Sequence, residues 1–244
     1  MTKPLLHTVD LSVGYSAKKP VLSNVTVTVL PSELVMVAGR NGSGKSTLLT
    51  TILGLLPALS GDILIKGRSI RKYSHAGRSR TLSYVPSKSN VINNFTIQQI
   101  IETGRAPYTG WNNRFSEADR FHVDEATANL GLSNILHRRL NEVSDGERQK
   151  AMIARAIAQD APIIILDEPT AFLDYPTRIE LIQILKMLTR EMKKAIVLSS
   201  HDLDILLPVV DSIWFCSDNG IVAEKADSMM QNNGFKMFFN KPSL

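Results

Sequence analysis

The segment from Gly39 to Thr47 has the residue types and the spacing that bind phosphate groups. It reads GRNGSGKST and fits the pattern G-x-x-x-x-G-K-[ST] at every fixed position. Its glycines let the backbone turn tightly, so that N–H groups and a helix N-terminus can surround phosphate oxygens. Lys45 would neutralise these oxygens, and Ser46 would ligate Mg²⁺. The pattern therefore predicts a bound nucleoside triphosphate, contacted by Gly39, Arg40, Asn41, Gly42, Ser43, Gly44, Lys45, Ser46 and Thr47.

Two adjacent carboxylates and one histidine follow apolar runs of the kind that form buried strands. Asp167 and Glu168 come directly after Ile163 to Leu166. Because neighbouring strand residues face opposite ways, the two carboxylates are expected to do different jobs. Asp167 suits the shell of Mg²⁺, and Glu168 suits proton abstraction from an attacking water. His201, which follows the run from Ala195 to Ser199, is expected to contact the γ-phosphate and position that water. The alternatives are a solvated turn for the carboxylates and a satisfied polar role for the histidine.

A second anion site is predicted at Ser144 to Glu147. The pattern Ser144-x-x-Glu147 is a capping box that begins a helix, and the N-terminus of a helix attracts anions. Gly146 would allow a phosphate to approach closely. The alternative is a capped helix that binds no ligand.

The same stretch resembles the signature sequence of the ATP-binding cassette (ABC) ATPases. It reads Val143-Ser-Asp-Gly-Glu-Arg-Gln149, with aspartate in place of one glycine of the family's LSGGQ pattern. In that family, an aromatic residue at the position of Tyr15 stacks on adenine. Asp174 matches the end of the family's D-loop, and His201 matches its switch histidine. The resemblance covers essentially residues 5 to 225.

The resemblance implies an ATPase that uses ATP and Mg²⁺. Lys45, Glu168 and His201 would be its catalytic residues, and Ser46 and Asp167 would hold the metal. Two nucleotides would be sandwiched in a head-to-tail homodimer, in which the second anion site of each subunit closes over the partner's ATP. Besides the phosphate loop, the expected nucleotide-binding residues are Tyr15, Ser144, Asp145, Gly146, Glu147 and Asp174.

A segment from Thr96 to Tyr108 resembles the G-R-x-P region of ATPases that drive importers of iron-siderophore complexes, haem and cobalamin. This implies two copies of the chain, integral membrane permease subunits and, indirectly, an extracytoplasmic substrate-binding protein, with no nucleic acid. The alternatives are another ABC transporter class, such as an exporter, a soluble ABC ATPase acting on nucleic acid or the ribosome, and a nucleotide-gated module that does not hydrolyse ATP.

One position departs from the family pattern. Where the family usually has a glutamine after Tyr-Val-Pro, this chain has Ser87. The shorter serine would reach a metal only through a water, unless Lys88 and Asn90 share the role. The departure concerns the coupling of hydrolysis to transport rather than ATP binding.

The elements that must position these residues indicate an α/β fold. The short apolar runs 33–38, 163–166 and 195–199 predict central parallel strands of a P-loop NTPase core, covered by helices such as 181–188. Residues 21–30 alternate as one antiparallel strand, and 1–30 with 61–70 predict an N-terminal antiparallel β subdomain. Between 89 and 155 an inserted helical lobe is expected, with a capping box at Ser116 to Asp119. The chain is thus predicted to be a single domain over 1–244, with a core of 1–88 and 156–244 and a helical subdomain of 89–155.

Composition sets outer limits on location and partners. The apolar runs of this 244-residue chain are far shorter than the ~20 residues that cross a bilayer, and Met1 to Pro4 does not begin a signal peptide. A single cysteine, Cys216, fits a reducing compartment and is expected to be a packed strand residue. Together with the resemblance, this predicts a peripheral protein on the cytoplasmic face of the inner membrane. The net charge of +5 permits an anionic partner but does not specify one.

Overall fold

The computed structural model describes residues 2–87, 94–109, 114–171, 173–217 and 220–231. Within these ranges, no helix is both long enough and apolar enough to cross a membrane. Lys88 and Asn90, proposed above to share the role of Ser87, lie outside the described residues.

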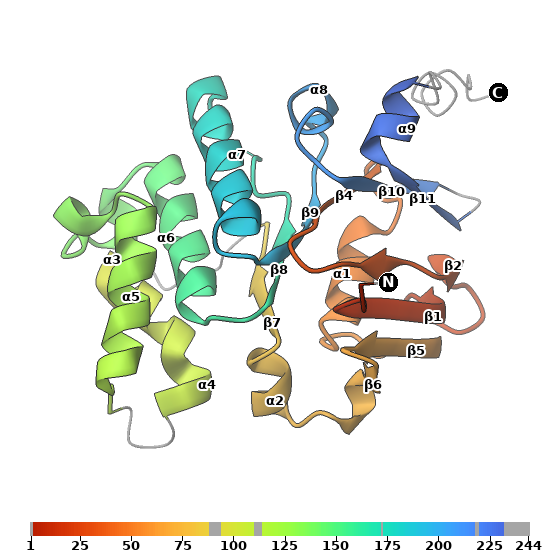
Figure 1. The fold of residues 1–244 in the computed structure, drawn as a ribbon, viewed down its shortest axis with the longest axis horizontal. Helices are drawn as coiled ribbons and strands as arrows, with labels where there is room; N and C mark the ends of the chain where they lie inside the picture. The colour runs from red at the N-terminus through yellow and green to blue at the C-terminus, as the bar shows by residue number, and fades with distance from the viewer. Residues whose placement is uncertain (1, 88–93, 110–113, 172, 218–219, 232–244) are drawn as a thin grey trace.

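A six-stranded sheet lies at the centre of the fold, with the strand order β11-β10-β4-β9-β8-β7 (Figure 1). Neighbouring strands from β10 to β7 pair in parallel, and β11 pairs antiparallel with β10. The three apolar runs form adjacent central strands, which confirms the mostly parallel sheet. The strands are β4 (Leu34–Gly39), β7 (Leu82–Val85), β8 (Ile163–Asp167), β9 (Ala195–Ser199), β10 (Ser212–Ser217) and β11 (Gly220–Lys225).

Successive residues of these strands face two separate cores. Val35 and Val37 of β4 pack with helix α1 (Lys45–Ile52) and with a smaller antiparallel sheet. Met36 and Ala38 lie on the opposite face of the strand, in a core that also contains residues of helix α7 (Tyr175–Arg190), which packs on β4. This alternation is the two-residue period of a strand, and it explains why both faces of the sheet are apolar.

The smaller sheet has the order β2-β1-β5-β6, with β3 also paired to β1. The predicted antiparallel β subdomain is therefore present, but the single strand expected over 21–30 is wrong, because this segment forms two strands. The hydroxyl of buried Thr8 in β1 donates to the carbonyl of Val25 and accepts from the N–H of Val27, so a side chain makes these hydrogen bonds where the segment is interrupted between its two strands. The strands are β1 (Leu6–Val13), β2 (Leu22–Val25), β3 (Thr28–Val29), β5 (Ser60–Ile65) and β6 (Arg68–Ser69).

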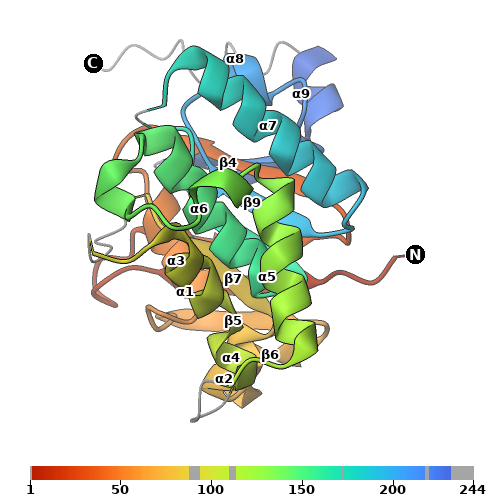
Figure 2. The ribbon, with the colours of Figure 1, turned by 90° about the vertical axis from the view of Figure 1, so that its left-hand side faces the viewer.

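Helices α6 (Asp145–Ala158) and α7 cover the face of the main sheet that points away from the antiparallel strands (Figures 1 and 2). Helices α5 and α3 both pack on α6, which runs unbroken across residue 155. The division of the chain at 88/89 and 155/156 stays a proposal. The α-helices other than α1 are α2 (His75–Ser79), α3 (Ile97–Glu102), α4 (Ala106–Thr109), α5 (Glu117–Asn129), α6 (Asp145–Ala158), α7 (Tyr175–Arg190), α8 (Leu203–Leu206) and α9 (Ala226–Gln231).

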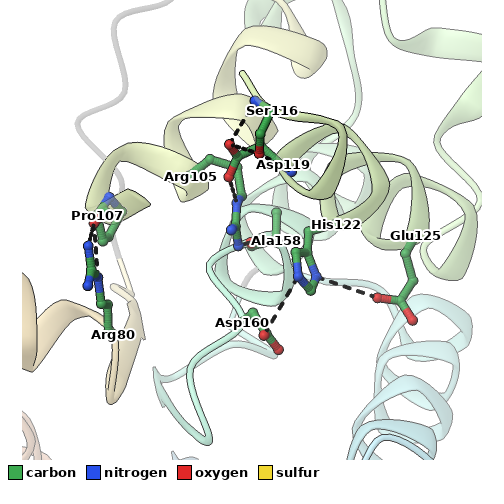
Figure 3. A network of polar contacts seen from close by, with 9 residues as sticks. All are labelled: Arg80, Arg105, Pro107, Ser116, Asp119, His122, Glu125, Ala158 and Asp160. Carbon is green, nitrogen blue, oxygen red and sulfur yellow. Dashed lines mark hydrogen bonds and ion pairs between the residues drawn. The ribbon is translucent and has the colours of Figure 1, made fainter. Parts of the chain in front are cut away.

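A buried ion pair between Arg105 and Asp119 connects α5 to α6 (Figure 3). The Arg105 guanidinium lies 2.8 Å from Asp119 Oδ1 and donates to the carbonyl of Ala158 at 2.7 Å. Ser116 caps α5 through the predicted capping box, and its hydroxyl donates to Asp119. Burial raises the pKa of Asp119, but the hydrogen bonds from Ser116 and Arg105 outweigh it and leave the pKa below its ordinary value. The segment that resembles the G-R-x-P region therefore anchors α5 and α6 to each other.

Candidate nucleotide-binding and hydrolysis site

The phosphate loop connects the carboxyl end of β4 to the first turn of α1. Gly39 has φ +150°, and a Cβ there would lie 2.6 Å from the carbonyl oxygen of Cys216. Gly44 has φ +95°, and a Cβ there would lie 2.6 Å from a methyl carbon of Val21. Both positions therefore need glycine for conformation and for space. Cys216 is itself a packed strand residue, as expected, and burial raises the pKa of its thiol to about 12.

The N-terminus of α1 has hydrogen-bond donors that no capping side chain satisfies. Gly44 is its N-cap and has no side chain, so the first N–H groups of the helix lack a side-chain cap. The buried hydroxyl of Ser43 has no hydrogen-bond partner among the described residues. Arg40, Asn41, Gly42 and Ser46 are exposed at the surface of the loop, and Thr47 is half-buried. Unpaired donors around an exposed loop fit an anionic, multidentate ligand such as a phosphate group.

Lys45 brings a buried positive charge to this loop. Its ammonium group donates to the carbonyls of Gly39 at 3.0 Å and Arg40 at 3.2 Å. The same nitrogen lies 3.7 Å from Glu168 Oε1, and the side chain is only 5% exposed. A buried cation with one distant carboxylate retains affinity for further negative charge.

The predicted metal ligands lie together although they are far apart in sequence. The Ser46 hydroxyl donates to Asp167 Oδ1 at 3.0 Å. Asp167 ends β8 and is buried, and its neighbour across the sheet is Ser199 at the end of β9. The carboxyl ends of β4, β9 and β8 are adjacent, which is why one edge of the sheet collects these groups.

Glu168 and His201 are also brought together. His201 Nε2 lies 2.8 Å from Glu168 Oε1, and both side chains are partly exposed. Glu168 has φ +49°, a left-handed conformation that is uncommon for a residue with a side chain. Lys45 and His201 therefore both face one oxygen of this carboxylate, and the three predicted catalytic residues form a single cluster.

The second predicted anion site is a separate place. Ser144 caps α6 through the expected capping box, in which Glu147 Oε2 accepts from both the N–H and the hydroxyl of Ser144. These hydrogen bonds, backbone first, hold the pKa of Glu147 below its ordinary value. Asp145 pairs with Arg148 at 2.7 Å. None of the contacts that these residues make within the described ranges reaches the phosphate loop, so one chain does not unite the two sites.

Gly146 and Asp174 both lie next to Thr177 in the first turns of helix α7. A Cβ on Gly146 would lie 2.9 Å from the methyl carbon of Thr177, so this glycine allows α6 to approach α7. Asp174 caps α7 by accepting from the N–H of Thr177, and this contact lowers the pKa of its carboxyl. Both residues thus have structural roles that the sequence pattern did not reveal.

The remaining predicted positions are at the surface. The side chain of Tyr15 is 80% exposed, which leaves its ring face free to stack. Ser87 is exposed two residues after the end of β7.

Sequence reasoning missed three hydroxyl residues next to the cluster. Ser199 contacts both Asp167 and Glu168. Ser200 lies 3.2 Å from the hydroxyl of Thr170 and accepts from the N–H of Asp202. The signal in the sequence was the pair Ser199-Ser200, which follows directly on an apolar run predicted to be a central strand of the same core as Asp167.

Comparison with known proteins decides the family. The family model described as ABC transporter matches residues 22–171. The chain belongs to this family. It is therefore an ATP-binding cassette that hydrolyses ATP, as the resemblance implied.

Relatives of this ABC ATPase are named for transport. The achromobactin transport ATP-binding protein of Dickeya dadantii is 33% identical over 83% of this chain and 75% of its own length. A probable siderophore transport system ATP-binding protein of Bacillus subtilis is 32% identical over 90% and 79%. The cobalamin import ATP-binding protein of Halobacterium salinarum is 36% identical over 82% of this chain, which spans only 50% of that protein.

A solved structure described as the dimeric structure of a bacterial ABC transporter cassette has the same fold. Its TM-score is 0.78 at 26% identity, covering 91% of this chain and 98% of that one. This agreement confirms the P-loop NTPase fold of the ABC ATPase described above.

Proposed function

We propose that this ABC ATPase drives an importer of iron-siderophore complexes, haem or cobalamin. The observation that carries its catalytic part is the cluster of Lys45, Glu168 and His201 beside the phosphate loop. The names of the relatives and the G-R-x-P segment support the choice of cargo. The cargo itself would be recognised by other subunits, because this chain's site is suited to nucleotide.

In this proposal the phosphate loop binds the triphosphate through its backbone N–H groups and the helix N-terminus. Lys45 neutralises phosphate oxygens, and the hydroxyl of Ser43 gains the partner that it lacks. The exposed ring of Tyr15 stacks on the adenine.

The residues present also fit Mg²⁺. The oxygens of Ser46 and Asp167 lie 3.0 Å apart, and Mg²⁺ prefers oxygen ligands. The described part of the chain has no cluster of three or more His, Cys, Asp or Glu residues able to hold a metal. Mg²⁺ is usually bound by one or two protein ligands together with phosphate oxygens of the substrate, and Ser46 and Asp167 suit that role. When bound, Mg²⁺ neutralises charge that develops on the phosphates during transfer.

Glu168 is the proposed general base, and His201 the group that orients it. An ionised carboxylate at this position accepts a proton from the water that attacks the γ-phosphate. His201 Nε2, 2.8 Å from Glu168 Oε1, holds that oxygen in place. Lys45 would contact the phosphates and also lies near Glu168, so the same cation would act in ATP binding and in hydrolysis.

The functional unit in this proposal is a head-to-tail homodimer. The second anion site, at Ser144 to Glu147, and Asp174 would contact the nucleotide held by the partner's phosphate loop. The separation of the two sites within one chain and the dimeric relative support this arrangement. The dimer would bind integral permease subunits at the cytoplasmic face of the inner membrane, and these would receive cargo from an extracytoplasmic binding protein.

The test is the change Glu168→Gln. This amide keeps the size of the side chain but cannot accept the proton, so steady-state ATP hydrolysis should fall by at least the ~10²-fold expected from loss of a general base. Binding of ATP should persist. In cells lacking the native gene, wild-type chain should restore uptake of a labelled siderophore complex or of cobalamin, and the variant should not. Near-normal hydrolysis by Glu168→Gln would show that another group is the base.

A further inference from the structure

The hydroxyl of Ser199 lies between the two carboxylate residues of the proposed site. Ser199 ends β9, its position in the sheet is opposite Asp167, and it is fully buried. Its Oγ is 2.6 Å from Asp167 Oδ1 and 2.8 Å from the backbone nitrogen of Glu168. A single side chain thus contacts the proposed metal ligand and the proposed base.

The chemistry of these groups sets the direction of both hydrogen bonds. The N–H of Glu168 can only donate, so the Ser199 oxygen accepts from it. The one hydroxyl hydrogen is then left for Asp167, whose carboxylate accepts it in a short, charge-assisted bond. Ser46 donates to the same carboxylate oxygen at 3.0 Å, so two hydroxyls orient Asp167.

The second contact holds a conformation that is not favourable by itself. Glu168 has φ +49°, and such a backbone persists only where its surroundings stabilise it. Its N–H is held by the carbonyl oxygen of Ser199 at 3.1 Å as well as by the hydroxyl. Loss of the hydroxyl would therefore loosen Glu168 without leaving a buried N–H unpaired.

We propose that Ser199 is a positioning residue for ATP hydrolysis, whose hydroxyl orients Asp167 for Mg²⁺ and Glu168 for the attacking water. This inference rests on the proposed roles of Asp167 and Glu168. Ser199 acts only through these two residues.

The chain offers a matched control in Ser83. This serine lies in β7, on the other side of β8, and is also buried. Its hydroxyl has no hydrogen-bond partner among the described residues. The change Ser83→Ala therefore removes a buried hydroxyl from the same sheet without removing a known contact.

The experiment compares Ser199→Ala, Ser199→Cys and Ser83→Ala in the full-length chain. Loss of a side chain that orients a ligand typically costs about 10- to 100-fold in activity or metal affinity. We expect kcat of both Ser199 variants to fall by about this factor. A second readout is binding at equilibrium: the gain in ATP affinity on adding Mg²⁺ should shrink in both Ser199 variants. Ser83→Ala should match the wild type in both measurements.

The cysteine variant keeps nearly the volume of serine but donates a much weaker hydrogen bond, so it covers the case in which alanine disturbs folding. All variants should first be shown to unfold near the same temperature. The positioning role is overturned if Ser199→Cys and Ser199→Ala then have the same kcat as Ser83→Ala and the same gain in ATP affinity on adding Mg²⁺. A normal rate in Glu168→Gln would instead overturn the proposed site. An inactive Glu168→Gln beside normal Ser199 variants would overturn the positioning role alone.

Discussion

Lys45 shows how one residue can link binding and chemistry. Its ammonium group is held by two carbonyls of its own loop and lies within 4 Å of Glu168, at 3.7 Å. These neighbours only partly offset its charge, and the side chain is almost fully buried. The energy that a phosphate would gain at this position is therefore larger than at an exposed lysine.

Lys45→Ala should weaken ATP binding itself. The change removes the one buried cation of the loop, and loss of a charge-assisted contact of this kind costs about 1.5–3 kcal/mol. This corresponds to roughly a 10- to 100-fold rise in the dissociation constant of ATP, measurable by titration with a fluorescent analogue. Arg40→Ala is a useful comparison because Arg40 is exposed in the same loop and should lose less. An unchanged affinity in Lys45→Ala would mean that the phosphates bind elsewhere.

At the scale of elements, the helices of the middle part depend on one buried ion pair. Arg105 precedes α4, Asp119 lies in the first turn of α5, and Ala158 ends α6, so the Arg105 guanidinium connects three elements. Gly104 adds to this, since a Cβ there would lie 2.3 Å from the carbonyl oxygen of Arg155. The packing of α5 and α6, and hence the position of Ser144 at the start of α6, relies on this contact.

Arg105→Ala should destabilise the fold strongly. Removing one partner of a buried pair leaves the other charge without compensation, which costs about 3–5 kcal/mol. The pKa of Asp119 is lower in the folded chain than in the unfolded chain, where it is about 3.9. The ionised carboxylate therefore stabilises the fold at pH above about 3.9, and this stabilisation is lost as the pH falls through the lower pKa of the folded chain. Urea unfolding of Arg105→Ala at neutral pH should therefore show a large loss in the free energy of unfolding. The difference in this free energy from the wild type should shrink in strong acid. Arg120→Ala, an exposed change on α5, the helix that carries Asp119, should be nearly neutral. Equal stability of the Arg105 and Arg120 variants would refute the anchoring role.

At the scale of the whole molecule, the two predicted nucleotide-contacting surfaces lie on different parts of the chain. The phosphate loop lies at the carboxyl end of the main sheet, and Ser144 begins a helix that packs with α3 and α5. The proposal of a composite site between two subunits follows from this separation.

Mixing two defective chains tests that arrangement. Ser144→Arg places a bulky cation in the second anion site, and Lys45→Ala disables the phosphate loop. In a mixed dimer both defects fall in one composite site and leave the other intact, so ATPase activity should partly return on mixing. Ser144→Asp keeps a good N-cap but adds negative charge, and should complement in the same way, which separates the effect from helix capping. Failure of both mixtures would count against sharing of sites between subunits.

The local features of this protein were determined by the sequence itself. Glycine spacing defines the phosphate loop, Ser116 and Ser144 begin helices through capping boxes, and apolar runs form the central strands. Each of these depends on residues within one turn or one strand, so the pattern is sufficient.

Only the tertiary structure decided the contacts between distant segments. The register of β8 and β9 places Ser199 against Asp167, the side chain of Thr8 divides a strand predicted to be continuous, and Arg105 finds its partners on two other helices. These outcomes depend on how strands align and helices pack across long sequence separations. Short-range periodicity carries no information about such alignment, and so the left-handed conformation of Glu168 and the buried hydroxyl that holds it could be found only in the folded chain.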